Sequence, residues 1–200
     1  MMINRIGFKS LSALLISISL IGMATAFAGE NNQANMTTQE LTALIKQIDV
    51  QNNLQIAATP EVLATINRIR TNEAARANMH MALENFDQHK AHLQNMLKDK
   101  SLPTELVVLT LLEPANKKPL SKNALQTLTA LHNHFQNWKL ALIAYKYGEA
   151  ATTNLIEATG SHDAWEIARA PQTPKDVKNF LAQFDASVII MNNPALVAGS

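Results

Sequence analysis

Apolar side chains recur at helical spacing along most of the chain from residue 37 to residue 192, and this periodicity constrains the fold more than any other feature. The last segment shows it well, because most of its apolar residues are three or four positions apart: Val177, Phe180, Leu181, Phe184, Val188 and Met191. No stretch alternates between apolar and polar residues for long enough to predict a strand. We therefore predict an all-α domain.

Capping signals divide this periodic region into separate helices. Thr37 to Glu40 form a capping box, and Thr59 precedes Pro60, which is tolerated in the first turn of a helix. A long third helix carries an apolar stripe that Lys90 interrupts. Further helix starts are predicted at Pro103, Ser121, Asn137, Ala151, Ser161 and Thr173, and ends at Glu113, Gly148, Gly160 and Asn193-Pro194.

The N-terminus is typical of a secretory signal peptide. Arg5 and Lys9 are basic, residues 11–23 are largely apolar, and small residues then offer cleavage after Ala26 or Ala28. The apolar run is shorter than the ~20 residues of a spanning helix, so we expect cleavage, a periplasmic location and no stable membrane insertion afterwards. The predicted organisation is a signal peptide (1–28), a flexible lead-in (29–36), an N-terminal helical region (37–100) and a second helical domain (101–200).

Charge and cysteine content narrow the function. The 200 residues include 17 Lys+Arg and 16 Asp+Glu, and removing residues 1–28 removes two basic residues, which leaves a net charge near −1. Such a balance gives no electrostatic reason to expect binding to nucleic acid or to an anionic membrane. The chain has no cysteine, which excludes disulfides and thiol chemistry.

The histidines do not form a convincing metal site. His132 and His134 are two positions apart and point to different sides of a helix, so they cannot share an ion. His89 and His92 are at i and i+3 and could share one, but no third ligand is near them in the sequence. We predict no metal and no cofactor.

The segment "LPTELVVLTLLE", residues 102–113, ends on the most informative side chain of the chain. Six aliphatic residues occupy the eight positions from 106 to 113, and Glu113 closes the run before Pro114. Apolar neighbours and a helix C-terminus both disfavour a charged carboxylate, so both raise its pKa. A raised pKa is what a general acid needs at neutral pH. The alternative is a glutamate that is merely exposed at a helix end.

Four segments together resemble lytic transglycosylases of the soluble-lytic-transglycosylase type. "LPTELVVLTLLE" resembles their catalytic segment, and "FQNWKLALIAYKYGEAA" resembles their Tyr-Asn-x-Gly-Glu block. "GSHDAWEIA" and "DVKNFLAQFDASVIIMNNP" resemble their C-terminal helices, closest to the membrane-bound lytic transglycosylase D branch and to similar domains of some membrane metallopeptidases. "ATPEVLATINRIRTN" also resembles their leader region, and the likeness covers residues 57 to 194.

The resemblance implies a lysozyme-like helical domain with extra N-terminal helices. Glu113 matches the general acid/base, and Tyr145, Lys146, Gly148 and Glu149 occupy the block that shapes the sugar-binding groove. In that family one glutamate protonates the bond between N-acetylmuramic acid and N-acetylglucosamine. It then acts as base while the muramyl 6-hydroxyl closes a 1,6-anhydro ring.

The chain also departs from the family pattern. Pro114 replaces a serine, Lys146 replaces the asparagine of the block, and Phe180 replaces an aromatic hydroxyl. Only seven residues, 114–120, follow Glu113 before the next helix, and the Gly-Leu-Met/Trp-Gln segment of one cleft wall is missing. We therefore expect a peptidoglycan-associated protein with a degenerate site that is weakly active or non-catalytic. An active murein lytic transglycosylase and a structural module that binds a periplasmic protein remain the alternatives.

Overall fold

The computed structural model describes residues 35–48, 54–98, 102–112 and 121–198, all within one compact unit that spans residues 33–200. The described residues contain helices and no strand, which confirms the predicted all-α class. The predicted signal peptide lies outside them. The helices are α1 (Thr38–Gln47), α2 (Pro60–Thr71), α3 (Glu73–Lys98), η2 (Thr104–Val108), α4 (Leu109–Leu112), α5 (Lys122–Phe135), α6 (Trp138–Tyr147), α7 (Glu149–Thr159), α8 (Ala164–Arg169), α9 (Lys175–Asn192) and η3 (Pro194–Leu196).

Most of the helix starts follow the predicted capping residues. Thr37 and Glu40 form the capping box of α1, and the side chains of Thr59, Ser121 and Asn137 accept backbone N–H groups of α2, α5 and α6. These side chains satisfy amide groups that have no partner within the helix. The sequence alone therefore located these four helices well.

Several predicted starts differ in detail from the structure. Helix α7 begins at Glu149 and not near Ala151, and the N-cap of α9 is Pro174 and not Thr173. The N-cap of α8 is Asp163, whose carboxylate accepts the N–H groups of Trp165 and Glu166, whereas the hydroxyl of Ser161 donates to Glu166. The segment expected as one helix from Pro103 is a 3-10 helix, η2, followed by a single α-helical turn, α4. Its β-branched pair Val107-Val108 has a weaker helix preference than leucine or alanine, which agrees with the tighter local geometry.

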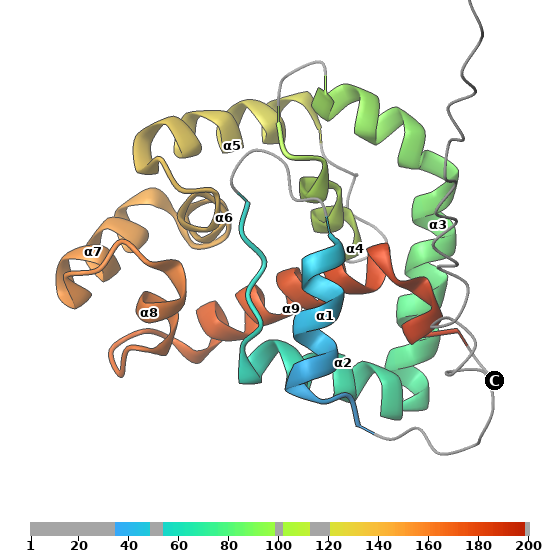
Figure 1. The fold of residues 1–200 in the computed structure, drawn as a ribbon. Helices are drawn as coiled ribbons and strands as arrows, with labels where there is room; N and C mark the ends of the chain where they lie inside the picture. Colours follow the sequence, from blue (N-terminus) through green and yellow to red (C-terminus); the bar gives the residue numbers. More distant parts are fainter. Residues whose placement is uncertain (1–34, 49–53, 99–101, 113–120, 199–200) are drawn as a thin grey trace, which may run out of the picture. The chain divides into compact units, whose positions relative to one another are not determined.

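Helix α9 is the centre of the fold. In Figure 1 it begins beside α8 and crosses the unit to end beside α3. It packs against α2, α8, η2, α4 and α6. Because neighbours surround it, the six consecutive residues 185–190 are all buried. The predicted apolar face of this helix is buried as expected, except that Met191 is only half-buried.

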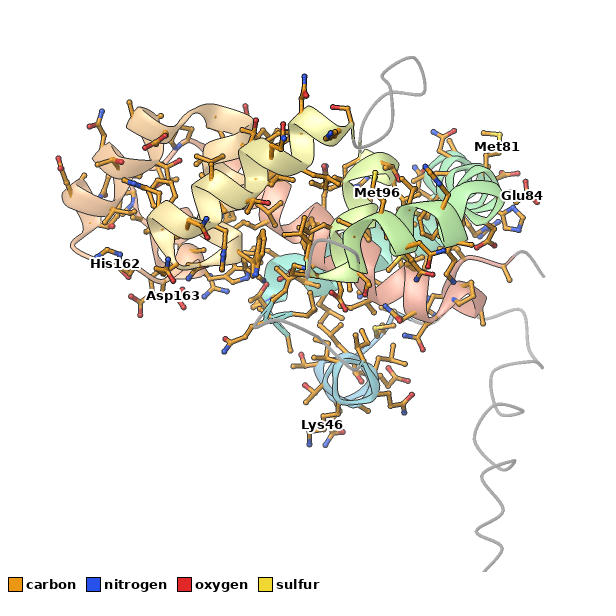
Figure 2. The ribbon with its side chains drawn as sticks, turned by 90° about the horizontal axis from the view of Figure 1, so that it is seen from above. Lys46, Met81, Glu84, Met96, His162 and Asp163 are labelled. Atoms are coloured by element: carbon orange, nitrogen blue, oxygen red, sulfur yellow. The ribbon has the colours of Figure 1, made fainter. Side chains whose placement is uncertain are left out.

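The predicted regions 37–100 and 101–200 contribute to the same core. Val62 and Ile66 of α2 belong to one buried cluster with Phe184 and Val188 of α9. A smaller cluster joins α2, α3, α9 and the C-terminal segment through Ile69, Leu83, Ile190 and Val197. The outer face of α3 is exposed, and Met81 and Glu84 project away from the core there (Figure 2). None of the described helices combines the length and the apolar character needed to cross a bilayer.

Candidate functional site

The predicted catalytic residue, Glu113, lies outside the described residues, as does Pro114. The structure describes the segment that leads to it. Leu106, Val107, Val108 and Leu109 are all buried, and the following turn ends with Leu112, which packs against the main core. The residues that precede position 113 are therefore apolar and largely buried, as expected, while the raised pKa of Glu113 stays a prediction.

The four predicted substrate-binding residues meet at the joint between α6 and α7. Tyr145 and Lys146 lie in the last turn of α6, Gly148 ends that helix, and Glu149 is the first residue of α7. Gly148 has φ 99°, a backbone conformation that side chains with a Cβ rarely adopt. Glycine therefore permits the sharp turn between the end of α6 and the start of α7. Tyr145 is half-buried, whereas Lys146, Gly148 and Glu149 are exposed.

Helix α9 contributes an aromatic ring to this joint. The Lys146 ammonium lies 4.6 Å from the ring centroid of Phe180 and 6.0 Å from that of Tyr147. The two rings meet edge to face with their centroids 6.2 Å apart. A cation over an aromatic ring is attracted by the ring quadrupole. Lys146 and Phe180, two positions where the sequence differs from the family that it resembles, lie against each other.

Two polar groups at the joint have contrasting surroundings. The Glu149 carboxylate is 3.7 Å from His134 Nδ1, which gives an ion pair across to α5 when the histidine is protonated. The Tyr147 hydroxyl is buried and has no hydrogen-bond partner among the described residues. Burial, followed by the charge of Asp176, raises the pKa of Tyr147. The joint therefore presents Lys146 and Glu149 at its surface, both with partners within the chain.

A shallow depression of about 420 Å³ lies along α5. The described residues that line it are Gln126, Thr129, Ala130 and Asn133, which form one face of α5. None of the predicted site residues is among them. Within the part of the chain that the structure describes, no group of three or more His, Cys, Asp or Glu side chains could hold a metal ion.

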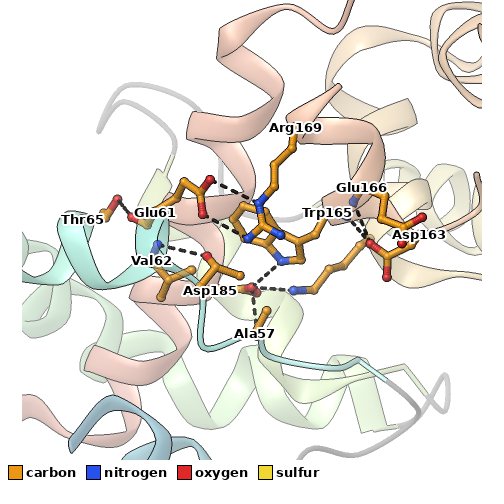
Figure 3. Close-up of polar contacts among 11 residues, drawn as sticks. Ala57, Glu61, Val62, Thr65, Asp163, Trp165, Glu166, Arg169 and Asp185 are labelled. Atoms are coloured by element: carbon orange, nitrogen blue, oxygen red, sulfur yellow. Dashed lines mark hydrogen bonds and ion pairs between the residues drawn. The ribbon is translucent and has the colours of Figure 1, made fainter. Parts of the chain in front are cut away.

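A second polar cluster, which the sequence did not predict, lies in the core. It consists of Lys139 of α6, Trp165 of α8 and Asp185 of α9, and we refer to these three residues as the buried cluster (Figure 3). The Lys139 ammonium donates to Asp185 Oδ2 at 2.5 Å, and the Trp165 indole N–H donates to the same oxygen at 3.2 Å. Lys139 is 7% exposed and Asp185 is fully buried.

The surroundings of the buried cluster perturb both charges. Burial lowers the pKa of Lys139 and raises the pKa of Asp185, and in each case the attraction of the partner acts in the opposite direction. Both pKa directions follow from the cost of removing a charge from water. In both groups burial is the larger cause of the shift and the attraction of the partner is the smaller one.

An exposed ion pair covers the cluster from one side. Arg169 donates two hydrogen bonds to the Glu61 carboxylate, at 3.2 and 3.1 Å, and its guanidinium lies 5.2 Å from the Trp165 ring. Lys139 lies 5.6 Å from the same ring. The indole thus interacts with two cations and links α2, α6, α8 and α9 in one network (Figure 3).

A signal for the buried cluster was present in the sequence. Lys139 follows Trp138 and precedes five apolar residues, and Asp185 stands between Phe184 and Ala186 in the most apolar part of the last helix. Charged residues are almost never fully buried unless they are paired. One lysine and one aspartate inside two apolar helices could therefore have predicted a buried ion pair.

The chain matches no protein-family model, no curated protein and no solved structure. The functional argument therefore depends on the geometry above and on the family resemblance of the sequence.

Proposed function

We propose that this chain is an exported, peptidoglycan-associated protein of the lytic-transglycosylase type with a lysozyme-like helical domain and a degenerate active site. It would reside in the periplasm and bind glycan strands, and it would cleave them weakly or not at all. The proposal rests on the sequence resemblance together with one observation of the structure, which is the contact between the α6–α7 joint and Phe180.

The resemblance places Lys146 in the block that shapes the sugar-binding groove and Phe180 where the family has an aromatic hydroxyl, and the two residues are 34 positions apart in the sequence. Their distance of 4.6 Å supports a common site. The same contact argues against efficient catalysis. An asparagine and a tyrosine in these places would offer hydrogen bonds to a sugar or to an acid, whereas an ammonium over a phenyl ring offers neither the amide nor the hydroxyl.

Catalysis requires positioning in addition to a proton donor. One acid at residue 113 can protonate a glycosidic oxygen, but ring closure also requires the muramyl 6-hydroxyl to be held against the anomeric carbon. A misplacement of about 1 Å can cost about 100-fold in rate. Loss of one cleft wall and of two orienting groups therefore predicts little or no turnover.

The test uses the chain from residue 29 onward, incubated with purified sacculi. Binding is measured by cosedimentation, and the soluble products are measured by mass analysis of muropeptides. We expect weak, saturable cosedimentation and little or no 1,6-anhydro product. Lys146→Glu should weaken cosedimentation, because it reverses a charge at the joint. Lys122→Glu, an equal charge reversal at the exposed start of α5, should leave it unchanged.

Two results would overturn the proposal in different ways. Abundant 1,6-anhydro product that Glu113→Gln abolishes would identify an active murein lytic transglycosylase. No cosedimentation and no product would instead favour a structural module that binds a periplasmic protein. Lys146→Asn combined with Phe180→Tyr should not restore turnover, because the missing cleft wall remains absent.

A further inference from the structure

A segment without regular secondary structure precedes α2 and contacts the buried cluster. Residues 54–59 form this segment, which we call the strap. Its first residue, Leu54, is fully buried, and its last, Thr59, is the N-cap of α2. Between them, the Ala57 N–H donates to Asp185 Oδ2 at 3.2 Å, a hydrogen bond between residues 128 positions apart (Figure 3).

The hydrogen bonds that Asp185 accepts from described residues all go to one carboxylate oxygen. Oδ2 accepts from Lys139, Trp165 and Ala57, which come from α6, α8 and the strap. Oδ1 is buried and has no hydrogen-bond partner among the described residues. A carboxylate that served only to neutralise Lys139 would not need to lie where a backbone N–H of a distant segment reaches it.

The pair is a poor source of global stability. Burying two charges costs several kcal/mol per ion, and well-packed apolar residues in their place are often as stable or more stable. The pKa directions of Lys139 and Asp185 agree with this, since burial outweighs the attraction in both. What the pair provides is a fixed acceptor in an otherwise apolar region, because Lys139 and Trp165 hold the carboxylate in one orientation.

We propose that Asp185, oriented by Lys139 and Trp165, is the anchor of the strap. The cluster fixes where the strap lies on α9, and the strap opens first when the acceptor is removed. This inference does not depend on the proposed function, because it is argued from contacts in the core and is tested at the strap.

Two double variants with the same charge separate the acceptor from the ion pair. Lys139→Met with Asp185→Asn removes both charges and keeps a side-chain oxygen for the Ala57 N–H. Lys139→Met with Asp185→Leu removes both charges and the oxygen. Ser187→Ala, a small change at a buried position of the same helix, is the control for general damage to α9.

The measurement is amide hydrogen exchange, resolved to single residues by NMR. In the Asp185→Leu double variant we expect the Ala57 amide to exchange about 10- to 100-fold faster than in the wild type, the range for losing a hydrogen bond to a charged group. Amides in the middle of α6 and α9 should keep their wild-type exchange rates. Ser187→Ala should leave the strap within about 3-fold of the wild type. The Asp185→Asn double variant should exchange clearly more slowly than the Asp185→Leu double variant, because its neutral oxygen still accepts from Ala57.

Equal exchange of the strap in the two double variants would overturn the inference, because apolar burial of the strap would then be sufficient. The wild type provides a test that does not depend on folding of the variants. Its Ala57 amide should exchange at least about 10-fold more slowly than those of Gln55 and Ile56 after correction for intrinsic rates. An Ala57 amide that exchanges as fast as its neighbours would also refute the anchor.

Discussion

Neutralising the buried ion pair one residue at a time should destabilise the protein far more than neutralising both residues together. Lys139→Met leaves the Asp185 carboxylate buried with only neutral donors, and Asp185→Asn leaves the Lys139 ammonium buried beside a neutral amide. Asp185 is fully buried and Lys139 is 7% exposed, so water cannot replace the lost partner in either variant. Each single substitution should therefore lower the free energy of unfolding by about 3 to 5 kcal/mol.

The double variant, Lys139→Met with Asp185→Asn, contains no buried charge. The side-chain oxygen of the introduced amide would still accept from Trp165 and Ala57, while the amide nitrogen would occupy one of the two former oxygen positions. If the nitrogen replaces Oδ1, it takes the place of an atom that has no hydrogen-bond partner among the described residues. Leaving such a group unsatisfied costs about 1 to 3 kcal/mol, and removing the two desolvated charges offsets part of that cost. We expect a net loss of about 2 kcal/mol or less.

Urea denaturation at pH 7, followed by circular dichroism at 222 nm, measures these differences. The two single losses would amount to at least about 6 kcal/mol if they were additive, so the cycle should give a coupling of at least about 4 kcal/mol. The control is the exposed pair of the same network. Glu61→Gln should lose less than about 1 kcal/mol, because the side chains of Glu61 and Arg169 are 24% and 42% exposed. Single losses below about 1 kcal/mol at Lys139 and Asp185, or strict additivity, would refute the reasoning.

Three further predictions concern groups outside the buried pair. Gln136 has φ 52° at the end of α5, so Gln136→Gly should raise the free energy of unfolding by about 0.5 to 1 kcal/mol, measured by urea titration. A decrease would show that the hydrogen bond from the Gln136 side chain to the Asn133 carbonyl outweighs the backbone strain. Burial lowers the pKa of His132 below 6.5, so its contribution to stability is present above pH 6.5 and is lost as the pH falls through the pKa of the folded state. His132→Phe, which keeps a ring against Trp138, should therefore lose less Tm than the wild type between pH 7 and pH 5. Hydrogen bonds from Arg169 lower the pKa of Glu61 below 4.5, so the wild type should lose Tm on acidification below pH 4.5 more steeply than Glu61→Gln. An equal loss of Tm in the two proteins below pH 4.5 would contradict this.

The sequence predicted most of the fold because local signals and packing agree. Thr37, Thr59, Ser121 and Asn137 are caps in the structure as in the prediction, and Gly148 and Gly160 end their helices. These signals depend on a few neighbouring residues. The start of α8 was predicted less well because Ser161 and Asp163 can both cap a helix, and the choice depends on the contact of Ser161 with Glu166. The 3-10 geometry of η2 was also not predictable from apolar spacing.

The sequence predicted less of the site, because a site depends on contacts between distant segments. The block from Tyr145 to Glu149 is local, and the joint at Gly148 follows from one glycine. The approach of Phe180 to Lys146 is a tertiary contact that the sequence did not predict. The hydrogen bond from Ala57 to Asp185 is donated by a backbone N–H group. The identity of residue 57 as alanine therefore gives no information about the partner of that group. Such a contact is found only when the helices are placed in space.

The buried cluster and the candidate site are connected through the same two helices. Lys139 and Lys146 are seven positions apart on α6, which is about two turns, so they lie on the same face of the helix. Their partners on α9, Asp185 and Phe180, follow in the opposite order along the chain, so α6 meets α9 at two points. The buried point is an ion pair with a directional hydrogen bond, whereas the exposed point is a cation over a ring, which tolerates displacement. We therefore expect the buried pair to constrain the position of α6 on α9 and, through it, the distance from Lys146 to Phe180. A change at Asp185 should in consequence alter the joint at Gly148, although no atom of the cluster belongs to that joint.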